Sequence, residues 1–172
     1  MAGTAARPLV VETLAGTGAA PAERIVTGLT EFDRVCGGGL VPGGVVLISG
    51  EPGIGKSTLL AQVCGAVADL GHDVLYITAE EGLEQVRDRC RRLGVTASGL
   101  RLAVTNDANT VAAALSGPRL VVLDSIQLVT LAEYDGTPGS PAQVRACAAV
   151  LIQAAKAAGC ALVLVGHVTK DG

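Results

Sequence analysis

Short apolar runs alternate with segments of helical periodicity from about residue 45 to the end of the chain. The runs that predict strands are VVLISG (45–50), DVLYITAE (73–80), RLAVT (101–105), LVVLDSIQ (120–127) and ALVLVGHV (161–168). The segments that predict helices cover residues 56–71, 81–94, about 108–115 and 141–159. Strands that alternate with helices of this length are typical of βαβ units. We therefore expect an α/β fold with a mostly parallel sheet and helices on both faces.

The N-terminal part has a different pattern. Residues 1–22 consist mainly of Ala, Gly, Thr and Pro around one apolar patch, PLVVETL, which is typical of a flexible linker or an N-terminal arm with a short strand. From Glu23 the pattern tightens, and GLTEFDRVCGGGL predicts a short helix with Thr30 as its N-cap and three glycines at its end. We therefore expect one globular domain over residues 23–172.

Composition and charge narrow the class of protein. The chain is 49% hydrophobic but only 2% aromatic, so Ala, Val and Leu must build the core, as in parallel α/β domains. The net charge of −3 provides no overall attraction to nucleic acid, so any DNA contact has to come from a local patch or from assembly. No run approaches the roughly 18 apolar residues of a membrane span, and no signal pattern opens the chain, so a cytoplasmic protein is expected.

The five cysteines form no C-x-x-C pair, which gives zinc ligation and redox chemistry no local support. We expect them to be small buried or partly buried hydrophobes.

The segment GEPGIGKS follows the first apolar run and matches G-x-x-x-x-G-K-[ST], the P-loop pattern. Glycines allow backbone N–H groups to curl around a β-phosphate, and the N-terminus of the next helix adds a positive partial charge. The Lys56 ammonium would reach the β- and γ-phosphates, and the Ser57 hydroxyl would bind Mg²⁺. The alternative, a glycine-rich turn with an incidental lysine, does not explain the strand before it and the helix after it.

Carboxylates follow two of the predicted strands. Asp124 ends the run LVVLD, where it could hold the Mg²⁺ shell opposite Ser57. Glu80 and Glu81 follow another strand, and one of them could orient the water that attacks a γ-phosphate. We favour Glu80 because it is the last residue of the predicted strand. The alternative is that both glutamates are the acidic first turn of the next helix.

The last predicted strand ends in GHVTK, and the same sheet would place His167 and Lys170 near the γ-phosphate. There they could respond to whether that phosphate is present. A histidine at the end of a strand is otherwise an ordinary surface residue.

These segments together resemble the ATPase core of the RadA (Sms) family of bacterial DNA-repair proteins, which are RecA-type ATPases. The matching segments, within residues 22–172, are ERIVTGLTEFDRVCGGGLVPGGVVLISGEPGIGKSTLL, VLYITAEEG, LVVLDSIQ, PGSPAQVRACAAVLIQAAK and LVLVGHVTKDG. The resemblance implies Mg²⁺-dependent ATP hydrolysis, a hexameric ring, and binding to single-stranded and branched DNA during recombination and repair. It also implies a RecA-like sheet of order 3-2-4-5-1, with strands numbered along the chain.

The resemblance assigns roles to particular residues. It makes Glu80 the catalytic glutamate, Asp124 the Walker-B carboxylate, and His167 and Lys170 sensors, while the loop from Tyr134 to Ser140 would face DNA. Nucleotide binding would rest on nine consecutive residues: Gly50, Glu51, Pro52, Gly53, Ile54, Gly55, Lys56, Ser57 and Thr58.

The chain also departs from the family pattern. The four-cysteine zinc finger, the KNRFG motif, the second DNA-facing loop and the Lon-protease-like domain are not found in it, and AEEG replaces the commoner GEES. We therefore expect slow ATP turnover with little stimulation by single-stranded DNA. In the family further strands pair with the free side of VVLISG, so that strand is expected to be an exposed apolar edge unless PLVVETL covers it. Two alternatives remain: a KaiC-like ATPase, which also pairs two glutamates after this strand, and a non-catalytic module that assembles when it binds nucleotide.

Overall fold

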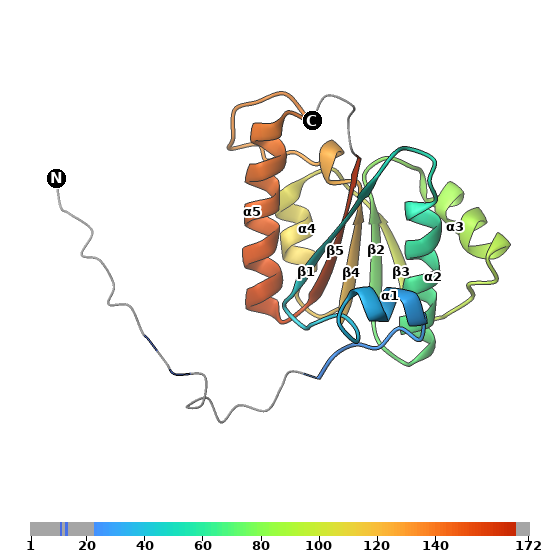
Figure 1. Ribbon diagram of the computed structural model, residues 1–172. Coiled ribbons are helices and arrows are strands. Elements are labelled where there is room, and N and C mark those ends of the chain that lie inside the picture. The colour runs from blue at the N-terminus through green and yellow to red at the C-terminus, as the bar shows by residue number, and fades with distance from the viewer. Residues whose placement is uncertain (1–10, 12, 14–22, 168–172) are drawn as a thin grey trace.

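The structure, a computed structural model, describes Val11, Thr13 and residues 23–167 (Figure 1). Its strands are β1 (Val45–Gly50), β2 (Val74–Thr78), β3 (Leu100–Val104), β4 (Leu120–Asp124) and β5 (Ala161–His167). Its helices are α1 (Thr30–Val35), α2 (Lys56–Asp69), α3 (Leu83–Arg92), α4 (Ala108–Ala114) and α5 (Pro141–Ala158), with a 3-10 turn η2 (Ile126–Leu128) after β4. The expected alternation of strands and helices is confirmed.

The five strands form one parallel sheet in the order β1-β5-β4-β2-β3. This is the expected order 3-2-4-5-1 read from the other edge. The last strand, β5, therefore lies between β1 and β4, with Gly50 opposite His167 and Leu123 opposite Leu164. Because all strands are parallel, their carboxyl ends meet at one edge of the sheet, and the loops that follow β1, β2 and β4 gather there beside the end of β5 (Figure 1).

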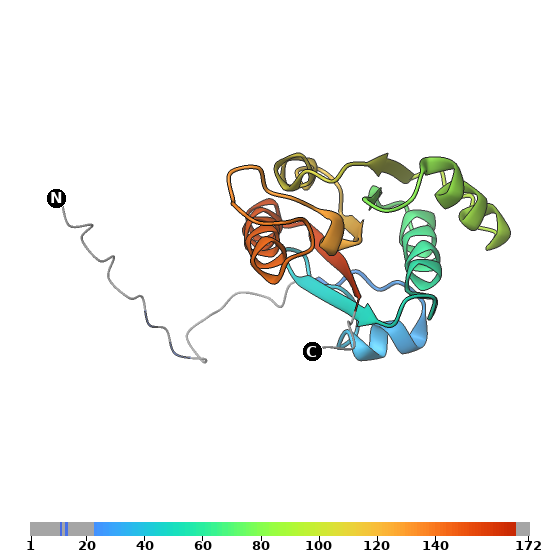
Figure 2. The same ribbon diagram turned by 90° about the horizontal axis from the view of Figure 1, so that it is seen from above.

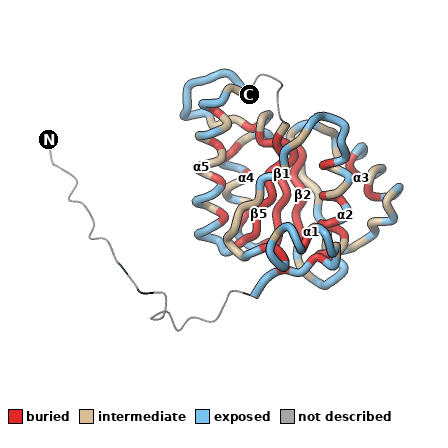
Figure 3. The backbone as a smooth tube through the Cα atoms, viewed as in Figure 1, coloured by how far each residue is buried: buried red, intermediate tan, exposed pale blue. Residues whose placement is uncertain are grey.

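Helices cover both faces of the sheet, which Figure 2 shows from above. On one face, strand residues such as Tyr76, Val122 and Val163 pack with α2 and α3. On the other face, their neighbours such as Ile77, Leu123 and Leu164 pack with α4 and α5. Side chains alternate between faces along a strand, so strands buried on both sides must be apolar throughout. The uninterrupted burial of β2 and β4 confirms this for the middle of the sheet (Figure 3).

The two edges of the sheet are less buried. In β1, Leu47 is 61% exposed and lies between apolar side chains from α1 on one side and α5 on the other. The expected exposed apolar edge is therefore present in the described structure. Val11 belongs to no strand and is 79% exposed, and the rest of PLVVETL apart from Thr13 lies outside the described residues.

The prediction that Thr30 caps α1 is wrong by one residue. Leu29 occupies the N-cap position and makes no side-chain cap bond, while Thr30 is the first helical residue. The carboxylate of Asp33 instead accepts hydrogen bonds from the backbone N–H groups of Thr27 and Gly28. A carboxylate inside the helix thus holds the chain that enters it, a contact that capping statistics do not anticipate.

The predicted strand around β2 ends too late, and the predicted helix after it begins too early. The strand ends at Thr78 rather than at residue 80, and α3 begins at Leu83 rather than at residue 81. Glu80 and Glu81 lie in the turn between them, so they are not the acidic first turn of the helix. Similarly, β4 ends at Asp124, and the remainder of LVVLDSIQ enters η2.

Four of the five cysteines are buried and Cys36 is partly buried, and none forms a disulfide. Burial raises the pKa of the Cys160 thiol to about 11, so it stays protonated at neutral pH. The burial of the cysteines agrees with the expectation that they act as small hydrophobic side chains. Among the described helices, none has the length and apolar character that a bilayer crossing requires.

Candidate functional site

The P-loop joins β1 to α2 at the carboxyl edge of the sheet. Gly53 and Gly55 have φ angles of 79° and 100°, in the left-handed region that glycine adopts at no steric cost. A Cβ at either position would meet nothing within 4 Å, so backbone conformation rather than space requires glycine there. Gly55 is the N-cap of α2 and supplies no side-chain acceptor, which leaves the first N–H groups of α2 available to an anion.

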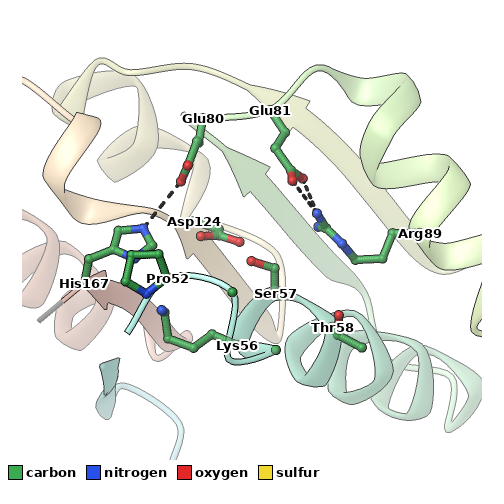
Figure 4. Close-up of a pocket in the computed structure, with 11 residues that line it drawn as sticks. Pro52, Lys56, Ser57, Thr58, Glu80, Glu81, Arg89, Asp124 and His167 are labelled. Carbon is green, nitrogen blue, oxygen red and sulfur yellow. Dashed lines mark hydrogen bonds and ion pairs between the residues drawn. The ribbon is translucent and has the colours of Figure 1, made fainter. Parts of the chain in front are cut away.

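Lys56 is the first residue of α2, and its side chain is buried against the loop. Its Nζ donates hydrogen bonds to the carbonyl oxygens of Gly50 at 2.8 Å and Glu51 at 2.9 Å. The ammonium therefore lies under the arch of the loop, with Ser57 and Thr58 following on the helix (Figure 4). The loop carbonyls hold the cation next to the backbone groups that would surround a phosphate.

Asp124, at the end of β4, is buried and paired with a tyrosine. The Tyr76 hydroxyl donates a 2.6 Å hydrogen bond to Oδ2 of Asp124. Tyr76 lies opposite Val122 in the neighbouring strand, so Asp124, two residues further on, projects from the same face of the sheet. Burial, reinforced by the Asp124 charge and hydrogen bond, raises the pKa of Tyr76, so the phenol remains a donor at any physiological pH.

Tyr76 was not among the site residues predicted from the sequence. One signal was available, because a tyrosine within a wholly apolar strand has to find a partner for its hydroxyl. That signal does not identify the partner, which lies 48 residues away in the chain.

Thr78 determines the conformation of the turn that carries the two glutamates. Its hydroxyl accepts hydrogen bonds from the backbone N–H groups of Glu80 at 3.3 Å and Glu81 at 2.8 Å, and donates one to the Glu81 carbonyl oxygen at 3.1 Å. A single buried hydroxyl thus orders both residues immediately after the strand. The local sequence T-A-E-E is sufficient for this turn, but it does not determine where the two carboxylates point.

The two carboxylates point in different directions (Figure 4). The Glu80 carboxylate extends toward the end of β5, where its Oε2 lies 3.5 Å from Nε2 of His167. The Glu81 carboxylate extends toward α3, where both its oxygens accept hydrogen bonds from Nη2 of Arg89. Arg89 was not predicted from the sequence as a site residue, because a basic residue near the end of a helix is commonly explained by the helix dipole.

These groups line one cavity of about 250 Å³ at the carboxyl edge of the sheet. The predicted site residues that line it are Pro52, Gly53, Gly55, Lys56, Ser57, Thr58, Glu80, Glu81, Asp124 and His167. Arg89 lines it as well. Three predicted nucleotide-binding residues, Gly50, Glu51 and Ile54, do not line the cavity, although the carbonyls of the first two hold Lys56. Lys170 lies outside the described residues.

The predicted loop from Tyr134 to Ser140 lies elsewhere at the same edge of the sheet (Figure 1). The buried Gln143 side chain holds it, because its Nε2 donates to the carbonyl oxygens of Leu131 at 3.2 Å and Tyr134 at 2.7 Å. Tyr134 itself is 46% exposed.

Two groups in the cavity could bind a divalent cation, the Ser57 hydroxyl and the Asp124 carboxylate. Oδ2 of Asp124 already accepts a hydrogen bond from Tyr76. Within the described residues no group of three or more His, Cys, Asp or Glu side chains could hold a metal ion alone. This donor set fits Mg²⁺, which takes few protein ligands and keeps waters or substrate phosphates in its shell.

The sheet order, the P-loop before α2 and the carboxylate after β4 define a RecA-like P-loop ATPase domain. Residues 12–172 match the protein family described as AAA domain, and the chain belongs to that family.

Within this class the chain is similar to DNA repair protein RadA of several bacteria. It is 48% identical to the protein of Brucella abortus over 158 residues, which are 88% of this chain and 34% of the relative. It is 44% identical to the proteins of Haemophilus influenzae, over 94% of this chain and 36% of the relative, and Pseudomonas aeruginosa, over 99% and 38%. The resemblance to RadA is thereby confirmed, and the chain spans about a third of the length of these relatives.

Two solved structures share the fold. A DnaB-like replicative helicase, described with its interactions with primase, aligns with a TM-score of 0.71 over 90% of this chain and 47% of its own. A second structure, described as an ATPase domain, aligns with a TM-score of 0.68 over 86% of this chain and 64% of its own. Both are 15% identical to this chain, so they confirm the RecA-like architecture alone.

Proposed function

We propose that this chain binds Mg²⁺-ATP and hydrolyses it, as the ATPase core of a RadA-type DNA-repair protein. The observation that carries the proposal is the cavity that brings together the P-loop, Asp124 and Glu80. Those groups come from three separate strand ends, and ATP hydrolysis requires all three: a phosphate cradle, a carboxylate for the metal and a carboxylate for the attacking water.

Each residue has a defined role in this proposal. When ATP binds, the Lys56 ammonium gives up its hydrogen bonds to the carbonyl oxygens of Gly50 and Glu51 and donates to oxygens of the β- and γ-phosphates instead. Ser57 and Asp124 hold Mg²⁺, which neutralises charge on the phosphate oxygens when bound, and Tyr76 keeps the Asp124 carboxylate in one orientation.

Glu80 orients the attacking water and accepts its proton. Its carboxylate is half-exposed and faces the cavity, where water can reach it. The neighbouring His167 imidazole would change its contact with Glu80 when a γ-phosphate enters, which is how it would act as a sensor.

The test is ATP binding and turnover in the wild-type chain, in Glu80→Gln and in Glu81→Gln. Glu80→Gln should retain Mg²⁺-ATP binding and lose about 10²-fold or more in turnover, the usual contribution of a general base. Glu81→Gln should lower turnover less. If Glu81→Gln loses more ATP turnover than Glu80→Gln, then Glu81 rather than Glu80 orients the attacking water. A wild-type chain that binds ATP without hydrolysing it would support a nucleotide-gated module.

Single-stranded and branched DNA and a hexameric ring belong to the same proposal. The relatives that support it are named as DNA repair proteins, and one structural neighbour is a replicative helicase. The 44–48% identity to RadA proteins favours this assignment over a KaiC-like ATPase.

The loop from Tyr134 to Ser140 is the proposed DNA contact. Residues 131–140 include Glu133 and Asp135 but no basic residue, so an exposed Tyr134 would stack on bases while phosphates are neutralised elsewhere. Binding of fluorescently labelled single-stranded DNA to the wild-type chain and to Tyr134→Ala tests this contact, and we expect weaker binding by the variant.

A further inference from the structure

Arg89 binds both carboxylate oxygens of Glu81 through one nitrogen, and this pair borders the phosphate cavity. The Glu81 side chain is 33% exposed and the Arg89 side chain only 13%. A partly buried arginine–carboxylate pair with two hydrogen bonds holds its geometry far better than a surface pair. Glu81 is therefore held on the α3 side of the cavity, away from His167 and the Glu80 carboxylate (Figure 4).

The arginine remains charged in this position. Burial by itself lowers the pKa of Arg89, but the hydrogen bond and charge of Glu81 raise it above its ordinary value, with smaller contributions from Tyr76 and Asp124. Arg89 thus faces two carboxylates, Glu81 directly and Asp124 at longer range.

We propose that Arg89 is a positioning residue, which withdraws Glu81 from the phosphate site and so leaves Glu80 as the one glutamate of the pair that is free to act on the attacking water. This inference rests on the proposed ATPase function. Two adjacent glutamates follow the strand, and nothing in their local sequence separates their roles. The long-range contact from α3 does so, because it uses both oxygens of Glu81 and neither oxygen of Glu80.

The proposal predicts a rescue that a purely structural role for Arg89 would not produce. In Glu80→Gln the remaining glutamate is Glu81, and Arg89 still holds it. Adding Arg89→Gln releases Glu81 into the cavity, where it can take over part of the work of the lost base. The double variant should therefore turn ATP over at least about threefold faster than Glu80→Gln alone, a fraction of the worth of a general base.

Two further variants serve as controls. Arg92→Gln removes an exposed arginine from the same helix and should not restore turnover to Glu80→Gln. Arg89→Lys keeps a cation beside Glu81 and should not restore it either. Circular dichroism on heating verifies the fold of each variant, and if glutamine at position 89 prevents folding, Arg89→Met, which keeps the aliphatic stem, replaces it. Binding of a fluorescent ATP analogue with Mg²⁺ reports nucleotide affinity separately from turnover.

The outcomes are distinct. Faster turnover in Glu80→Gln/Arg89→Gln than in Glu80→Gln, with similar nucleotide affinity, supports the proposal. Equal turnover in those two folded variants overturns it. A loss of affinity of about tenfold or more in Arg89→Gln but not in Arg92→Gln also overturns it, because Arg89 would then contact the nucleotide itself. A wild-type chain that binds no ATP, or binds it without turnover, overturns the ATPase function and this inference with it.

Discussion

The Tyr76 hydroxyl lies 2.6 Å from Oδ2 of Asp124, on a face of the parallel sheet where the core side chains are mainly apolar. The pair connects two adjacent strands, β2 and β4, at the point where their carboxyl ends approach the phosphate cavity. A buried carboxylate with a fixed hydrogen bond on one oxygen presents its other oxygen in one direction. Tyr76, which is packed in the core, therefore fixes the orientation of a carboxylate that lines the phosphate cavity.

Tyr76→Phe should remove the hydrogen bond to Asp124 without altering the shape of the core. We expect the free energy of unfolding to fall by about 1–3 kcal/mol, because Asp124 loses the donor for a buried oxygen. The Mg²⁺ concentration that gives half-maximal ATP binding should rise as the carboxylate loses its orientation. Tyr134→Phe, at the exposed tyrosine, is the matched control and should change neither quantity. An unchanged Mg²⁺ dependence in a folded Tyr76→Phe would mean that Asp124 does not depend on the tyrosine.

Lys56→Ala should abolish tight binding of Mg²⁺-ATP. Lys56 is the only lysine or arginine of the P-loop segment GEPGIGKS, and its ammonium already lies under the loop. Calorimetric titration with ATP and Mg²⁺ measures the loss. Lys156→Ala, an exposed position on α5, controls for the removal of a positive charge. Undiminished affinity in Lys56→Ala would exclude the P-loop as the phosphate site.

Gln143→Leu should loosen the loop over residues 131–140. The Gln143 amide accepts a hydrogen bond from the Leu131 N–H at 3.1 Å and donates to the Leu131 and Tyr134 carbonyls. Leucine leaves these backbone groups without hydrogen-bond partners, and each one that stays buried lowers the free energy of unfolding by about 1–3 kcal/mol. Limited proteolysis should therefore cut this loop faster, whereas Gln153→Leu, exposed on the same helix, should not change the rate of cleavage.

Leu47→Lys should reduce self-association of the 172-residue chain. Leu47 is 61% exposed on β1, an edge of the described sheet, and an apolar edge strand favours pairing with other chains. A lysine there should leave the free energy of unfolding within about 0.5 kcal/mol of wild type. Light scattering as a function of concentration measures the effect. Leu70→Lys, 60% exposed but at the end of α2, should leave association as it is.

Regularities that are local in the chain were predictable from sequence. The strands and helices follow from runs and periods within about ten to twenty residues, and the P-loop follows from eight consecutive residues between a strand and a helix. The parallel sheet then places the ends of β1, β2, β4 and β5 at one edge, so Lys56, Glu80, Asp124 and His167 had to lie near each other. The order of the strands came from the RadA resemblance and is confirmed.

What the sequence determined by itself is therefore the set of candidate groups and the edge where they meet. The tertiary structure decided their orientations. Glu80 and Glu81 are chemically identical neighbours, and contacts with distant elements separate them: Arg89 of α3 binds Glu81, whereas His167 at the end of β5 lies next to Glu80. Tyr76 and Asp124 meet because β2 and β4 are neighbours in register, although 48 residues separate them in the chain. A side chain's direction depends on what packs against it, and those partners come from distant parts of the chain that no local pattern connects.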